Sequence, residues 1–151
     1  MGIDTTPYKI AERFIGLKEV KGPVDNPQVL AMLQLDNTWV GHDEVAWCSA
    51  FVNYVAWLLR LPRSKQLSAR SWLAIGGMIP PLDAKQGFDV VVLKRGEGDQ
   101  PGPEVLQAPG HVGFFGGYEG RHVWLLGGNQ SDQVSLAPFL YENILGVRRL
   151  S

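Results

Sequence analysis

Apolar residues in the first half of the chain recur every three or four positions, the spacing of one helix face. This periodicity predicts four helices, over residues 6–17, 26–35, 47–59 and 68–75. Residues typical of helix ends support the assignment, because Pro7 suits a first helical position and Asn26 suits an N-cap. Pro62 is expected to end the third helix, since proline cannot continue one. The first half of the chain is therefore expected to be helical.

The second half has a different pattern, in which short β-branched and aromatic runs are bounded by glycine. The expected strands are residues 88–94, 111–115, 122–126, a short stretch at Val134, and 145–150. Residues 95–110 are rich in Gly, Pro and Gln and are expected to form an exposed loop. Helices followed by antiparallel strands indicate an α+β fold, with N-terminal helices packed on one side of an antiparallel sheet of about five or six strands.

Composition narrows the class of protein. The chain has 151 residues, of which 45% are apolar and 19% charged, as in an ordinary soluble globular protein. We therefore expect a single domain, the catalytic one, over residues 1–151. The net charge of −1 argues against nucleic acid as a partner. The sequence contains neither a signal-peptide pattern nor an apolar stretch long enough for a membrane span, so we expect synthesis in the cytoplasm, no membrane insertion and a monomer.

Cys48 is the only cysteine and stands at the start of the third expected helix. A lone cysteine in an apolar helix is commonly a small core residue. The first turn of a helix, however, has unpaired N–H groups and the positive end of the helix dipole, and both stabilise a thiolate. Because this cysteine lies near a helix start among polar residues, we interpret Cys48 as a candidate nucleophile.

A histidine that opens a strand is the preferred base. His111 follows a Gly-rich loop, at a sheet rim where a side chain can be both accessible and rigidly held. Asn129 ends the neighbouring expected strand and could orient the imidazole, with Gln130 and Asp132 as weaker candidates for that task. His42 is a rival base, but it lies on a loop that would hold its geometry less well.

Residues around the cysteine are candidates for substrate binding. Asp43 and Glu44 could recognise a substrate amine, or could only stabilise the helix dipole. Trp39 and Trp47 flank the same loop and are candidate cleft walls, and Ser49 adds a hydroxyl beside them. The three histidines lack the spacing of metal ligands, so neither a metal nor another cofactor is expected.

Four segments in order resemble the CHAP/NlpC-type cysteine amidases, which are papain-like peptidoglycan hydrolases of phages and bacteria. They are Trp47-Cys48-Ser49-Ala50-Phe51-Val52-Asn53-Tyr54, Phe88-Asp89-Val90-Val91-Val92, Gly110-His111-Val112-Gly113-Phe114-Phe115 and Gly127-Gly128-Asn129-Gln130. The resemblance implies a papain-like fold with Cys48 as nucleophile, His111 as base and Asn129 as orienting residue. Some relatives have aspartate where this chain has Trp47, so substrate-recognition residues of that subgroup do not transfer.

The resemblance implies an endolysin-like enzyme that cleaves an amide bond of bacterial cell-wall peptide, acting on peptidoglycan in the periplasm after release. Two alternatives stay open. An interbacterial amidase effector toxin would use the same chemistry, and a catalytically inactive wall-binding domain would keep only the fold. The sequence also leaves open which peptidoglycan bond is cut.

Overall fold

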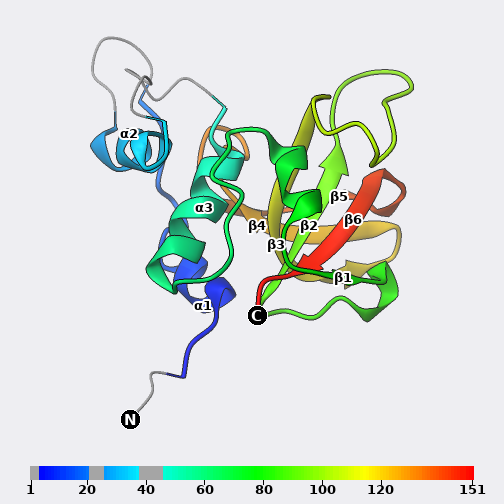
Figure 1. Cartoon of the computed structure of the whole chain (residues 1–151), viewed down its shortest axis with the longest axis horizontal. Coiled ribbons are helices and arrows are strands. Elements are labelled where there is room, and N and C mark those ends of the chain that lie inside the picture. The colour runs from blue at the N-terminus through cyan, green and yellow to red at the C-terminus, as the bar shows by residue number, and fades with distance from the viewer. Residues whose placement is uncertain (1–3, 21–25, 38–45) are drawn as a thin grey trace.

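The computed structural model describes residues 4–20, 26–37 and 46–151, and its elements follow one another as the colours of Figure 1 show. The helices are α1 (Pro7–Glu12), α2 (Pro27–Gln34) and α3 (Cys48–Leu58), with short 3-10 helices η1 (Ala69–Ala74), η2 (Pro81–Asp83) and η3 (Tyr141–Asn143). The strands are β1 (Gly77–Ile79), β2 (Asp89–Lys94), β3 (Gly110–Glu119), β4 (His122–Gly127), β5 (Ser135–Leu140) and β6 (Ile144–Arg149).

Two helix starts carry the caps that the sequence predicts. The Thr6 hydroxyl accepts a hydrogen bond from the Lys9 N–H at the start of α1, and Asn26 caps α2. The expected helix over residues 6–17 was too long, because α1 ends at Glu12 and the chain turns through Gly16. Gly16 has a φ of +96°, outside the helical region, and its turn frees the following residues to pair with another segment.

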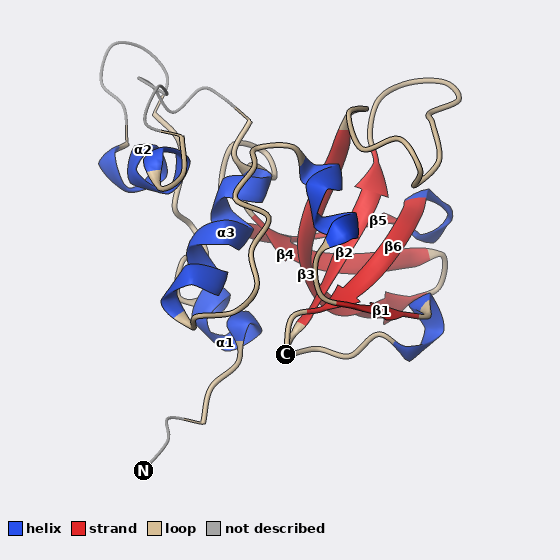
Figure 2. Ribbon diagram, viewed as in Figure 1, coloured by secondary structure: helices blue, strands red, loops and turns tan. Residues whose placement is uncertain are grey.

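The strands form one antiparallel sheet in the order β1-β6-β2-β3-β4-β5. Strand β1 was not expected from the sequence, since it is only three residues long and mostly exposed. The short strand expected at Val134 is displaced, because β5 begins at Ser135 and runs to Leu140; β5 tolerates Pro138 because it lies at the sheet edge. Figure 2 shows the three α-helices gathered to one side of the strands. The α+β class and the six-stranded antiparallel sheet are confirmed.

Two apolar layers cover the two faces of the sheet. The larger layer packs α3 against β3 through residues such as Phe51, Val112 and Phe114. The smaller layer lies on the opposite face and includes Leu93 and Phe115. Within the part of the chain that the structure describes, no helix has the length and apolarity needed to cross a membrane.

A buried ion pair joins β2 to β6. Asp89 is 1% exposed and accepts two hydrogen bonds from Arg149, at 2.7 Å from Nε and 2.9 Å from Nη2. Its carboxylate also accepts the Lys85 N–H. Asp89 is therefore a structural residue that fastens the strand start, far along β2 from the end that meets His111.

Candidate active site

Cys48 is the first residue of α3. The N-cap position is held by Trp47, which makes no side-chain hydrogen bond to the first turn, so the N–H groups there have no capping side chain. The Cys48 side chain is 3% exposed and belongs to the layer between α3 and the sheet. This placement combines the positive end of an 11-residue helix with a largely dry environment.

The start of β3 projects beyond its neighbour β4 and meets the cysteine. The last pair between these strands is Phe114 with Leu126, so the two residues before Gly113 have β2 on one side only. On the open side, His111 and the Val112 backbone lie close enough to Cys48 for both to lower the pKa of its thiol. Because β4 ends early, Cys48 can lie against the start of β3, beside a candidate base.

The pKa values of the pair move in the directions that favour an ion pair. Burial acts to raise the pKa of the Cys48 thiol, but the hydrogen bond and charge of His111, with smaller effects of Val112 and Arg95, lower it overall. Burial acts to lower the pKa of His111, but its interactions with Cys48 and Gln130 raise it overall. Both shifts act in the direction that stabilises a thiolate beside an imidazolium.

Gln130 is the partner of the histidine on the other side of the ring. Its Oε1 lies 2.9 Å from His111 Nε2. The amide nitrogen of Gln130 donates to two carbonyl oxygens, those of Leu125 at 3.1 Å and Ser135 at 2.7 Å, so Oε1 must be the acceptor toward the ring. His111 Nε2 therefore carries its proton, and Nδ1 is the nitrogen that can accept the Cys48 proton.

The structure differs from the sequence expectation at this position, because Gln130 and not Asn129 bonds the ring. Asn129, Ser131 and Asp132 all have positive φ values, of 56°, 56° and 61°. These left-handed residues on both sides of Gln130 bend the chain so that Gln130 points inward, with 5% exposure. Asn129 is half-buried and faces the adjoining cavity instead.

Two glycines make room for this turn. A Cβ on Gly127 would lie 2.6 Å from Gln130 Oε1, so only glycine leaves the amide its place against His111. A Cβ on Gly128 would lie 2.7 Å from the Trp47 ring, so glycine also allows the start of α3 to approach the turn. The turn is further tied to the N-terminal segment, since Val134 exchanges backbone hydrogen bonds with residues 16–17.

A buried arginine holds the loop that leads into His111. Arg70, in η1, is fully buried and donates to the carbonyl oxygens of Pro109 at 2.9 Å, Gly102 at 2.7 Å and Val105 at 3.0 Å. The expected loop over residues 95–110 is thus exposed on its outer side but anchored on its inner side. The anchor at Pro109 lies two residues before His111.

Two expected substrate-binding residues have structural roles. Trp47 is fully buried against Gly128, so it is not a cleft wall in the described structure. Ser49 is also fully buried, and its hydroxyl donates to the Gln66 carbonyl and accepts from Trp72 Nε1 at 2.9 Å. The helical rotation from Cys48 to the next residue turns this side chain inward. The remaining candidates, Trp39, His42, Asp43 and Glu44, lie outside the described residues.

A cavity of about 500 Å³ adjoins the other face of His111. It is lined by basic and apolar residues at the end of β2, by polar residues of the turn around Gln130, and by the β5–η3 segment, whose contribution is mainly apolar. Lys94 and Arg95 belong to this lining and were not singled out from the sequence. Strand pairing was the signal that could have found them, because Lys94 pairs with Gly110 and so lies beside the start of β3.

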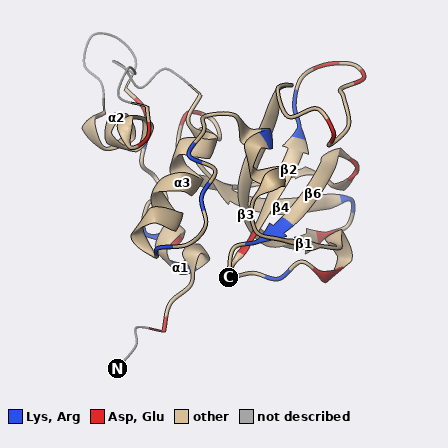
Figure 3. Ribbon diagram, in the orientation of Figure 1, with Lys and Arg blue, Asp and Glu red and all other residues tan. Residues whose placement is uncertain are grey.

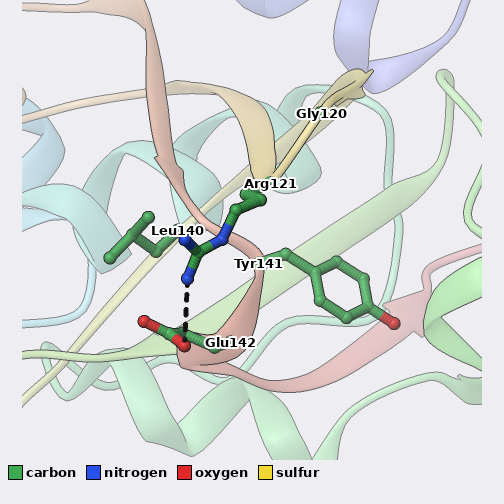
Figure 4. A pocket seen from close by; sticks show the side chains of 5 residues that line it. All are labelled: Gly120, Arg121, Leu140, Tyr141 and Glu142. Carbon is green, nitrogen blue, oxygen red and sulfur yellow. Dashed lines mark ion pairs between the residues drawn. The ribbon is translucent and has the colours of Figure 1, made fainter.

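A second cavity, of about 210 Å³, lies at the opposite end of β4. In Figure 4, Arg121 points toward Glu142 across this cavity, with Nη2 and Oε2 3.8 Å apart, while the Tyr141 ring points away. Both charged side chains are largely exposed, at 82% and 64%. No cysteine or histidine lines it, whereas the cavity beside His111 adjoins the residues around Cys48, so the candidate active site is the one around His111. In the described parts of the chain, no three His, Cys, Asp or Glu side chains gather as a metal site would require.

Comparison with known proteins bears on the fold. The chain is similar to the solved structure of NlpC1 from Trichomonas vaginalis, with a TM-score of 0.57 and 14% sequence identity over 95% of this chain. The fold is a papain-like NlpC fold. The match spans 42% of the NlpC1 chain, and at this identity the likeness shows the fold alone. No protein-family model and no curated protein matches the sequence.

Proposed function

We propose that this chain is a cysteine amidase or peptidase that hydrolyses a peptide amide of peptidoglycan. The observation that carries the proposal is that His111 adjoins Cys48 and is hydrogen-bonded to Gln130, in a papain-like NlpC fold. The lowered pKa of Cys48 and the raised pKa of His111 support these two residues as an activated pair. In this proposal Gln130 takes the orienting role that the sequence assigned to Asn129.

The proposed reaction has two steps. The Cys48 thiolate attacks the carbonyl carbon, and the imidazolium of His111 gives its Nδ1 proton to the leaving nitrogen, which yields an acyl-enzyme and a free amine. His111 then removes a proton from water, which attacks the thioester and regenerates the thiolate as the acid departs. Gln130 keeps Nε2 protonated throughout, so that Nδ1 stays directed at the reacting atoms.

The first turn of α3 supplies electrostatic stabilisation. The Cys48 backbone N–H is the candidate oxyanion donor, because it belongs to the uncapped first turn. One such donor contributes about 100- to 1,000-fold in rate. General base catalysis contributes a further factor of about 100 to 10,000.

Purified peptidoglycan provides the direct test. Mass spectrometry of released fragments should detect product with the wild type and none with Cys48→Ala, and the fragment masses identify the bond. His122→Ala is the matched control, since His122 is exposed at the far end of β4. The enzyme hypothesis fails if the wild type releases nothing, or if Cys48→Ala releases as much.

The endolysin-like role is the proposed biological setting, and its support is the sequence resemblance. An effector toxin would give the same fragments, so genes for holin and spanin proteins beside this one, or an immunity gene, distinguish the two. An inactive wall-binding domain predicts that Cys48→Ser keeps full biological activity. It also predicts no alkylation of Cys48 by iodoacetamide at pH 6, where an ordinary thiol with a pKa of about 8.5 is protonated.

A further inference from the structure

We propose that the cavity beside His111 is a carboxylate-binding subsite, in which Arg95 and Lys94 receive an anionic group of the substrate close to the scissile amide. The inference rests on the proposed function and adds a substrate class to it, namely peptides with a free carboxylate near the bond that is cut. The proposal follows from the charges that line the cavity, from the lack of internal partners for its cations, and from its contact with the base.

The lining carries positive charge and hydrogen-bond donors on one side and apolar residues of β5 on the other. Lys94 and Arg95 are its charged members beside His111, and no Asp or Glu takes part. Asn129, Ser131 and Asn143 add amide and hydroxyl groups. A guanidinium together with amide donors suits a planar carboxylate, which accepts several hydrogen bonds at once. The volume of about 500 Å³ leaves room for the side chain that bears the carboxylate.

The cavity cations differ from those arginines of the described structure that are paired with a carboxylate. Arg149 pairs with Asp89 and Arg63 pairs with Asp36 at 2.8 Å. Among the described residues, neither Lys94 nor Arg95 has an ion-pair partner. A cation without an internal partner at a cavity wall is a group that a ligand can engage.

Nearby acidic residues do not neutralise the lining. Glu97 and Asp99 follow on the same loop, but both are exposed and neither lines the cavity. Figure 3 shows this arrangement, with a basic segment at the end of β2 and acidic positions farther along the loop. The net charge of the whole chain is −1, so the positive region is local and fits a small anionic group better than an extended polyanion.

The subsite is within electrostatic reach of the reacting groups. His111 lines the cavity directly, and the charge of Arg95 contributes to lowering the pKa of Cys48 and opposes the rise in the pKa of His111. A carboxylate bound at Arg95 would therefore lie next to the base. This position ties recognition of the anion to the orientation of the amide at Cys48.

Alkylation of Cys48 tests the charge of the subsite without a natural substrate. Iodoacetate and iodoacetamide differ in one negative charge. In the wild type, the ratio of the iodoacetate rate to the iodoacetamide rate should be higher than that of an ordinary exposed thiol. Arg95→Gln should lower this ratio about fivefold, the upper range for losing one solvent-exposed ion pair. Arg121→Gln is the matched control, because Arg121 is exposed at the opposite end of β4. An unchanged ratio in Arg95→Gln, or an equal fall in the control, overturns the proposal.

Binding to Cys48→Ala tests the subsite independently of catalysis. N-acetyl-alanyl-alanine should shift the NMR signals of the Asn129 and Asn143 side-chain amides, its C-terminal amide should not, and Arg95→Gln should weaken the binding of the acid about fivefold. Equal binding of the acid and its amide, or binding of inorganic phosphate as tight as that of the acid, overturns the carboxylate assignment. Peptidoglycan release without acid binding rejects the subsite alone, and acid binding without release rejects the proposed function alone.

Discussion

The two neighbours of His111 come from regions of opposite character. Cys48 begins a regular helix of 11 residues whose apolar face is sealed against the sheet. Gln130 belongs to an irregular turn in which three non-glycine residues have positive φ. The helix supplies an electrostatic field from its dipole and its uncapped N–H groups, and its backbone has ordinary helical dihedral angles. The turn supplies a single hydrogen bond at 2.9 Å and depends on unusual backbone throughout.

Because of this difference, substitutions on the two sides of the site should affect different properties of the protein. A change on the helix side has to disturb a buried layer before it reaches Cys48, so stability should respond first. A change on the turn side can move the Gln130 amide while the fold stays intact, so activity and the pKa of His111 should respond first. The predictions below test this division, with activity measured as peptide release from peptidoglycan.

The largest effect on the turn side is expected from Gln130→Met, which keeps side-chain length but removes the acceptor for His111 Nε2–H. Activity should fall about 100-fold, the lower end of what a general base contributes, because the ring loses its fixed tautomer. Asn129→Gly is the comparison, since glycine accepts the positive φ of that position, and its activity should fall much less because the bond to His111 is kept and only one donor of the proposed subsite is lost. The reverse result would restore Asn129 as the orienting residue.

A smaller loss is expected from Gly127→Ala. The new Cβ would lie 2.6 Å from Gln130 Oε1, and the amide must shift away from His111 to relieve the contact. Activity should fall roughly tenfold, as part of the general base contribution is lost, with little change in the thermal unfolding midpoint. Gly77→Ala, where a Cβ meets nothing within 4 Å, should change neither. A large loss of stability in Gly127→Ala would show that the turn is part of the folding core.

The same division explains which residues the sequence could predict. Cys48 and His111 each open an element whose period is visible in the sequence, so both type and position could be predicted. The choice between Asn129 and its neighbour depends on backbone dihedrals in a turn without any period, where one residue decides which side chain points inward. Lys94 stood at the end of an expected strand, but its relation to the site required the pairing with Gly110.

A change on the helix side should affect stability rather than chemistry. Ser49→Ala removes the acceptor of Trp72 Nε1–H and the donor to the Gln66 carbonyl, both in a buried setting. The free energy of unfolding, measured by denaturant titration, should fall by about 1–3 kcal/mol, while KM changes less than about twofold. A raised KM with unchanged stability would show that Ser49 binds substrate after all.

The smallest effect is a displacement of one limb of a pH profile. The reactive ion pair forms as pH rises through the lowered pKa of Cys48, and it is lost as pH rises through the raised pKa of His111. Gln130 helps to raise the latter, because a hydrogen-bond acceptor at Nε2 stabilises the imidazolium more than the neutral ring. Gln130→Met should therefore move the alkaline limb to lower pH and leave the acid limb nearly in place, as followed by NMR of the His111 ring. Movement of the acid limb alone would mean that Gln130 changes the pKa of the Cys48 thiol. The helix side and the turn side of the site would then not act independently.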